Sequence, residues 1–228
     1  MYVYRVFVII LLIVSYYVFL YGVIKIFSMD GLLYRVGMWL YHFMYLNILF
    51  ILSCIPIITI FPAIAALFGV VRQWKINKEV AIFSQYKTMF IENWKQSYLV
   101  GILFTVISLF LTVNFLFLSQ MASPYKIIIY VATVLVSFMF ILSFLSIYPL
   151  MVNMTTTFKR LCISSLQVGL YKINLTIFCM IVLGAWTILS LRFSFLIFFF
   201  FFSVSAYLIY WIADLKFTKL IPQEASEN

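Results

Sequence analysis

Residues 173–214 read INLTIFCMIVLGAWTILSLRFSFLIFFFFFSVSAYLIYWIAD, and this apolar run decides the fold class. A membrane-spanning helix needs about 20 mainly apolar residues, so the run is about twice as long as one span requires. Its one basic residue, Arg192, lies near the middle of the run. A charge buried at the bilayer centre costs about 2.5–3.5 kcal/mol. We therefore predict two spans joined by a tight hairpin at residues 190–194, which places Arg192 in water.

The whole chain shares this apolar character. Of its 228 residues, 67% are hydrophobic and only 9% are charged, and the mean hydropathy is +1.18. Soluble domains are about half apolar and a quarter charged, so this composition excludes a water-soluble globular protein, a disordered chain and a disulfide scaffold. The expected fold class is all-α, a polytopic bundle of transmembrane helices.

Other stretches of span length precede the long run, at residues 3–24, 36–56, 98–121 and 127–150. The stretch 56–71 is short for a span and contains Pro56 and Pro62. It is expected either to cross back as a bent helix or to form a re-entrant element. With a bent helix there, the chain has six core spans after residue 28.

The basic residues set the expected orientation. Twelve of the 15 Lys and Arg residues fall in segments 25–35, 72–97, 151–172 and 215–228, and the other three are Arg5, Lys126 and Arg192. Basic residues accumulate on the cytoplasmic side of membrane proteins, so these four segments and the C-terminus are predicted to be cytoplasmic. Because the positive charge is explained by topology, no nucleic-acid partner is expected.

This division suggests three parts of the chain. Residues 1–28 form an extra N-terminal hydrophobic segment, which is either a seventh span or a stretch upstream of a true start at Met29. Residues 29–220 form the membrane domain, and residues 221–228 form a polar C-terminal tail.

Few residues are suited to chemistry. The chain has one histidine, His42, six acidic residues, and three widely spaced cysteines without a CxxC pair. Metal sites need several convergent His, Cys or carboxylate ligands, and none of the common hydrolase or nucleotide-binding motifs is present. We therefore expect no enzyme activity, no metal and no cofactor.

Two predicted cytoplasmic segments, 79–97 and 154–172, are amphipathic at helical spacing and precede apolar runs. Aromatic residues gather on one face of the first, with lysines largely on the other, as in helices that lie at a membrane surface rich in anionic lipids. Such a surface serves either lipid contact or docking of a cytoplasmic partner. Its candidate residues are Phe83, Tyr86, Lys87, Phe90, Trp94 and Lys95.

Polar and helix-breaking residues within the spans are the other candidates. An intramembrane amide must find a hydrogen-bond partner, and prolines free backbone carbonyls, so such residues either line a polar ligand site or hold helices together. The candidates are Asn47, Pro56, Thr59, Pro62, Asn114 and Asn153. The small residues Ala65 and Gly69, four apart, predict a close approach of another helix.

A family resemblance rests on several short runs. They are Gly31-Leu32-Leu33-Tyr34-Arg35, Tyr45-Leu46-Asn47, Cys54-Ile55-Pro56, Thr59, Phe61-Pro62-Ala63, Ala65-Ala66-Leu67, Phe83, Phe90, Glu92-Asn93-Trp94-Lys95-Gln96 and Tyr148-Pro149-Leu150. Over about residues 29–220 the chain resembles YesL-family proteins, bacterial membrane proteins of unknown molecular function often encoded near carbohydrate-uptake permeases. The resemblance implies a plasma-membrane protein that acts beside sugar import, with no catalytic residues to transfer.

The expected function is that of a non-enzymatic accessory or assembly subunit for carbohydrate uptake of the ABC type, with an importer permease as partner. The alternative is a substrate-binding membrane subunit of an importer. A polar pocket enclosed by Asn47, Asn114 and the Pro56–Pro62 turn would favour the alternative, whereas scattered or interhelical amides would count against it.

Overall fold

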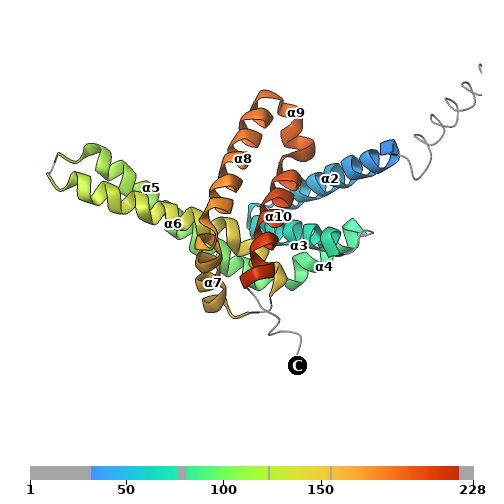
Figure 1. Ribbon diagram of the computed structural model, residues 1–228, viewed down its shortest axis with the longest axis horizontal. Helices are drawn as coiled ribbons and strands as arrows, with labels where there is room; N and C mark the ends of the chain where they lie inside the picture. Colours follow the sequence, from blue (N-terminus) through green and yellow to red (C-terminus); the bar gives the residue numbers. More distant parts are fainter. Residues whose placement is uncertain (1–31, 77–80, 123, 155, 221–228) are drawn as a thin grey trace, which may run out of the picture. The chain divides into compact units, whose positions relative to one another are not determined.

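The computed structural model describes residues 32–76, 81–122, 124–154 and 156–220 (Figure 1). The segments predicted at residues 1–28 and 221–228 lie outside these ranges. All regular elements of the described ranges are helical, which confirms the all-α fold class. They are α2 (Leu32–Cys54), η1 (Ile57–Thr59), α3 (Ile60–Ile76), α4 (Ile82–Glu92), α5 (Trp94–Gln120), α6 (Lys126–Asn153), α7 (Phe158–Leu170), α8 (Ile173–Arg192), α9 (Ser194–Leu196), η2 (Ile197–Phe201) and α10 (Phe202–Leu220).

Six helical stretches in these ranges are long and apolar enough to cross a membrane, so the protein is a multi-pass membrane protein. They are Leu33–Cys54, Ile57–Ile76, Trp94–Gln120, Lys126–Asn153, Ile173–Arg192 and Ser194–Phe217. The predicted break in the long apolar run is confirmed, because α8 ends at Arg192 and the next helix begins at Ser194. The uncertain stretch after Pro56 is helical, with a short 3-10 turn before α3.

The chain divides into two units, residues 1–44 and 45–228. The described part of the first unit is the N-terminal half of α2, residues 32–44. Its aromatic side chains are mostly exposed, and neighbouring rings pair along the helix, with centroids 5.7 Å apart for Trp39–Phe43 and for Tyr41–His42.

In the second unit the buried core is centred on α3, which contacts α4, α5, α6 and α10. Ala63, Ala65 and Ala66 are fully buried, because short side chains let neighbouring backbones approach closely. A Cβ atom at Gly69 would lie 2.8 Å from the Cβ atom of Met89 on α4. The close helix approach predicted at Ala65 and Gly69 therefore occurs, and the helix that approaches is α4.

The start of α5 lies beside the start of α3. The Tyr98 hydroxyl donates a hydrogen bond to the carbonyl of Ile58 (2.5 Å), and a Cβ atom at Gly101 would overlap the Phe61 ring. Because α4 connects the end of α3 to the start of α5, α3 and α4 form a helical hairpin. Its second helix leads the chain back to the start of α3.

The helix α7 packs against α6 in a similar way, because a Cβ atom at Gly169 would lie 2.9 Å from the backbone oxygen of Leu142. Leu161 and Val168 are buried on the same face of α7. The two amphipathic segments therefore bury their apolar faces against helices of the same chain as well as presenting an outer face.

The helices α5 and α6 lie side by side as a hairpin (Figure 1), and their outer surface differs from that of the core. Beyond the first turns of α5 and before the last turns of α6, most side chains are exposed, and large ones such as Phe117, Ile127 and Ile128 are among the most exposed in the described chain. Such a continuous apolar surface is stable only in lipid or against another membrane protein.

Candidate functional site

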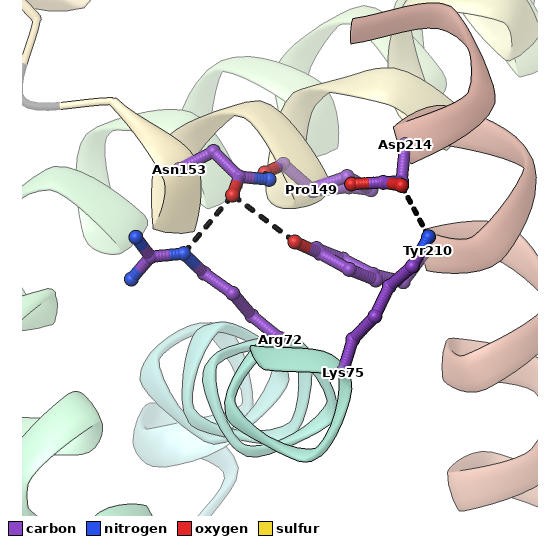
Figure 2. A network of polar contacts seen from close by, with 6 residues as sticks. All are labelled: Arg72, Lys75, Pro149, Asn153, Tyr210 and Asp214. Carbon is purple, nitrogen blue, oxygen red and sulfur yellow. Dashed lines mark hydrogen bonds and ion pairs between the residues drawn. The ribbon is translucent and has the colours of Figure 1, made fainter. Parts of the chain in front are cut away.

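A polar cluster joins α3, α6 and α10 at one end of the core (Figure 2). The side-chain oxygen of Asn153 accepts two hydrogen bonds, one from Arg72 Nε (3.0 Å) and one from the Tyr210 hydroxyl (3.0 Å). The Asn153 amide nitrogen donates to the carbonyl of Pro149, one turn earlier in α6 (2.8 Å). One amide thus fixes three helices in register, which is the role expected of a polar residue buried between membrane helices.

An ion pair between Lys75 and Asp214 lies next to this cluster and again links α3 to α10. With Lys75 and Asp214 compensating each other, Arg72 supplies the net positive charge of the group. Arg72 uses only its Nε atom, and its terminal nitrogens make no hydrogen bond to the described residues. The arrangement can therefore accept a carboxylate or phosphate without breaking its internal bonds.

Asn47 is fully buried and holds the turn that starts the last helix. Its nitrogen donates to the carbonyls of Ile197 (3.2 Å) and Phe198 (2.7 Å), and its oxygen accepts from the backbone N–H groups of Phe202 (2.9 Å) and Ser203 (3.1 Å). This stretch contains the π-helical turn η2, where widening of the helix displaces the regular backbone bonds. In lipid such groups must be satisfied by protein, and Asn47 satisfies four of them.

Lys216 is a buried basic residue that the sequence pattern did not single out. Its side chain is 2% exposed, and its ammonium group donates to the carbonyl of Val168 (3.1 Å) and to the Thr176 hydroxyl. Thr176 in turn donates to the carbonyl of Gly169 (2.9 Å). A cation at the C-terminal end of α7 compensates the partial negative charge of the last carbonyls. The signal in the sequence was that apolar residues at helical spacing, Tyr210, Ala213 and Phe217, continue past the end of the long apolar run.

The remaining predicted polar candidates do not converge. Asn114 donates to the carbonyl of Phe110 in its own helix (3.4 Å), whereas the Thr59 hydroxyl bonds to the carbonyls of Ser53 and Pro56, both at 2.5 Å. Pro62 is buried in the core and Pro56 is exposed. These residues, Asn47 and Asn153 thus make separate helix contacts, and the described residues form no shared polar lining around them.

The candidate interface residues of the first amphipathic segment fall into two groups. Phe83, Lys87, Trp94 and Lys95 are exposed. Tyr86 is buried, which raises the pKa of its hydroxyl, while the neighbouring Ser53 side chain opposes that shift. Phe90 is half-buried between two rings, with centroid distances of 6.3 Å to Tyr86 and 5.2 Å to Trp94. Because Tyr86 is buried, a partner protein or a lipid surface that contacts the outer face of this segment would not contact Tyr86.

An apolar pocket of about 250 Å³ opens where α7 meets the base of the α5–α6 hairpin. Leu103 and Ile107 come from α5, Val136 and Met139 from α6, and Cys162 from α7. The Ser165 hydroxyl beside them donates to the carbonyl of Cys162 (2.8 Å), so it does not make the pocket polar. Burial raises the pKa of the Cys162 thiol, which favours its uncharged form. The pocket suits an aliphatic group and not a sugar.

Comparison with known proteins places this architecture in a family context. Residues 43–115 match the family model described as "Protein of unknown function, DUF624". The uncharacterized protein YesL of Bacillus subtilis (strain 168) is 30% identical over 115 residues, which cover 49% of this chain and 54% of that protein. The predicted resemblance to the YesL family is confirmed. The chain spans about half the length of the curated relative it matches, and no solved structure matches it.

The DUF624 match covers the second half of α2, the α3–α4 hairpin and most of α5. It includes Asn47 and Arg72, and it ends before Asn153, Tyr210 and Lys216. The polar contacts that link α3 to later helices therefore join the matched region to the part of the chain outside the match.

Proposed function

We propose that the protein is a non-enzymatic subunit of a membrane complex that assists carbohydrate import of the ABC type, and that it binds an importer permease. The observation that supports this proposal best is the use made of polar groups within the helices. Asn47, Asn153 and Lys216 bond to other helices of the same chain, and Asn114 bonds within its own helix. Their polar atoms serve packing, so the outer surface that the apolar helices leave for partners is mainly apolar.

The α5–α6 hairpin is the surface proposed for the permease. Its two long neighbouring helices expose large side chains on most sides, including Phe110, Phe117 and Ile127. The sugar-import context rests on the YesL-family resemblance. The substrate-binding alternative has less support, because Asn47, Asn114 and the Pro56–Pro62 turn do not enclose a common pocket.

Site-specific photocrosslinking in native membranes tests this proposal. A photoreactive residue is placed at Leu116 of α5, and a matched one at Ile181 of α8, both of which are exposed. Tagged protein is then purified and its adducts are identified by mass spectrometry. We expect a permease adduct from position 116 and a much weaker one from position 181. Recovery of the chain without a permease at either position would reject the proposal.

For orientation, we propose a bacterial plasma-membrane location with the C-terminus in the cytoplasm. The proposal is supported by the concentration of basic residues in segments 72–97, 151–172 and 215–228. A C-terminal reporter that fluoresces only in the cytoplasm should be active, and a periplasmic phosphatase fused at the same position should be inactive. The opposite pattern would reverse the orientation.

A further inference from the structure

The pocket at the base of the α5–α6 hairpin has a feature that the proposed partner does not explain. It is lined by two candidate spans and by α7, and its side chains there are almost all apolar. Apolar cavities of about 150 Å³ exclude water and accept a benzene-sized ligand, and this one measures about 250 Å³. Val136 and Met139 on its rim are exposed on the hairpin, so the pocket continues into the apolar outer surface of the hairpin.

Basic residues lie beside the pocket on the same helix. Lys159 precedes Cys162 by three residues and Leu166 by seven, so all three lie along one face of α7. Both Cys162 and Leu166 line the pocket, which places Lys159 about 4.5 Å along the helix axis from its nearer edge. Lys159 and its neighbour Arg160 are exposed and make no hydrogen bond or ion pair with other described residues.

We propose that this pocket is a binding site for one acyl chain of an anionic phospholipid, with Lys159 and Arg160 holding the phosphate. The apolar lining of the pocket would hold the acyl chain. Lys159 and Arg160, about one helical turn away, would supply positive charge for the negatively charged phosphate. Basic positions beside pockets between membrane helices bind acidic head groups in this way. The bound lipid fills the space between α7 and the hairpin and fixes the angle at which the hairpin leaves the core.

The test uses the purified full-length protein and two photoactivatable lipids, phosphatidylglycerol and phosphatidylcholine, which carry the same acyl chains. The photoreactive group lies near the end of one chain, and crosslinked peptides are mapped by mass spectrometry. We expect adducts in α5, α6 and α7 around the pocket, with phosphatidylglycerol favoured by at least about fivefold, since one basic residue near a head group contributes about that factor.

Two pairs of variants separate the acyl-chain site from general lipid contact. Leu166→Trp fills the pocket and should remove the adducts there, whereas Ile163→Trp, on the exposed face of α7, should leave them. The pair Lys159→Gln and Arg160→Gln should reduce the preference for phosphatidylglycerol to about twofold or less, and Lys87→Gln with Lys95→Gln on the α4–α5 segment should not.

The outcomes that overturn the inference are equally specific. Adducts spread evenly over α2, α5, α6 and α8 would show ordinary lipid contact. Pocket adducts of equal strength for both lipids would show an acyl-chain site without the proposed head-group contact. None of these results depends on a permease, so failure of the lipid site and failure of the proposed function are distinguishable.

Discussion

The stretch formed by η1 and α3, and the two helices of the α5–α6 hairpin, are all long and apolar enough to cross a membrane, yet protein covers them to very different degrees. In the most apolar 18-residue segment of each stretch, half of the residues are buried for η1 with α3, compared with 22% for α5 and 11% for α6. α3 carries Ala63, Ala65, Ala66 and Gly69 at its contacts, whereas the hairpin exposes Phe, Ile, Leu and Val. Length and hydropathy thus identify apolar helices, and side-chain size indicates whether protein or lipid covers them.

The contacts of α3 extend this difference to topology. Because Tyr98 bonds to the carbonyl of Ile58, the start of α5 lies at the level of the start of α3. α4 therefore reverses the path of α3. In that arrangement α3 is the buried half of a helical hairpin, whereas α5 and α6 run from the core as a pair whose outer surface is left for lipid or a protein partner.

The largest expected effect is a labelling pattern. Single cysteines replace Ile58 and Leu99, in a chain whose native cysteines are changed to serine, and intact cells are treated with a membrane-impermeant thiol reagent. The α3–α4 hairpin predicts that both positions respond alike: either both are labelled in intact cells, or both are labelled only in inverted vesicles. If α3 crosses the membrane alone and α4 stays at one surface, the two positions will differ.

Loss of core packing should give the next largest effect. Leu150 in α6 is buried, and Leu150→Ala should lower the free energy of unfolding by about 2–5 kcal/mol. Leu135, in the same helix but exposed on the hairpin, should lose less than about 0.5 kcal/mol in Leu135→Ala. Unfolding of both variants in mixed SDS–detergent micelles measures the difference. Equal losses would mean that protein covers the hairpin as fully as the core.

Glycines provide a second comparison of the two regions. In Gly169→Ala the new Cβ atom would lie 2.9 Å from the backbone oxygen of Leu142, so α7 must shift, and we expect a loss of about 1–3 kcal/mol. At Gly184 in α8 an added Cβ atom would have no neighbouring atom within 4 Å, and Gly184→Ala should be neutral or slightly stabilising. Thermal unfolding in the same detergent compares them, and a greater loss for Gly184→Ala would contradict this packing.

The features predicted correctly from sequence are those set by neighbouring residues. The break at Arg192 followed from the cost of a charge in the middle of a long apolar run, and the amphipathic segments followed from helical spacing. The close contact at Gly69 followed from its small size, although not the identity of α4 as its partner.

Contacts between distant residues were out of reach. Asn47 and its backbone partners are about 150 positions apart, so the sequence indicated that the amide needed partners but not which ones. Lys216 was counted with the cytoplasmic charges because it follows the apolar run that ends at residue 214, and only the packing of α7 and α8 around it explains its burial. The pocket depends on the angle between α7 and the hairpin, which no local pattern specifies.

The amides of Asn47 and Asn114 differ in the number of their hydrogen bonds, and we expect a smaller difference in the free energy of unfolding between variants at these two positions. Asn47→Leu removes four hydrogen bonds to the backbone around η2, and we expect a loss of about 1–2 kcal/mol. Asn114→Leu removes one bond within α5, and the loss should stay below about 0.5 kcal/mol. Unfolding in SDS–detergent micelles measures both losses. A larger loss for Asn114→Leu would place its important partner outside the described contacts.

The smallest effect on the free energy of unfolding is expected at Lys216. Removing its charge should cost less than removing its hydrogen-bond partner, the Thr176 hydroxyl. Lys216→Met keeps most of the side-chain volume and removes the buried cation, and the desolvation cost removed with it offsets the lost bonds. We expect a change within about 0.5 kcal/mol.

Thr176→Val leaves the cation in place with one oxygen fewer and also frees the carbonyl of Gly169, so it should cost about 1 kcal/mol. In the double variant the cost of Thr176→Val should shrink, because the cation that needs the hydroxyl is gone. Purely additive losses would mean that Lys216 finds its stabilisation elsewhere, and a cost of Lys216→Met above that of Thr176→Val would assign the charge a role beyond holding α7, α8 and α10 together.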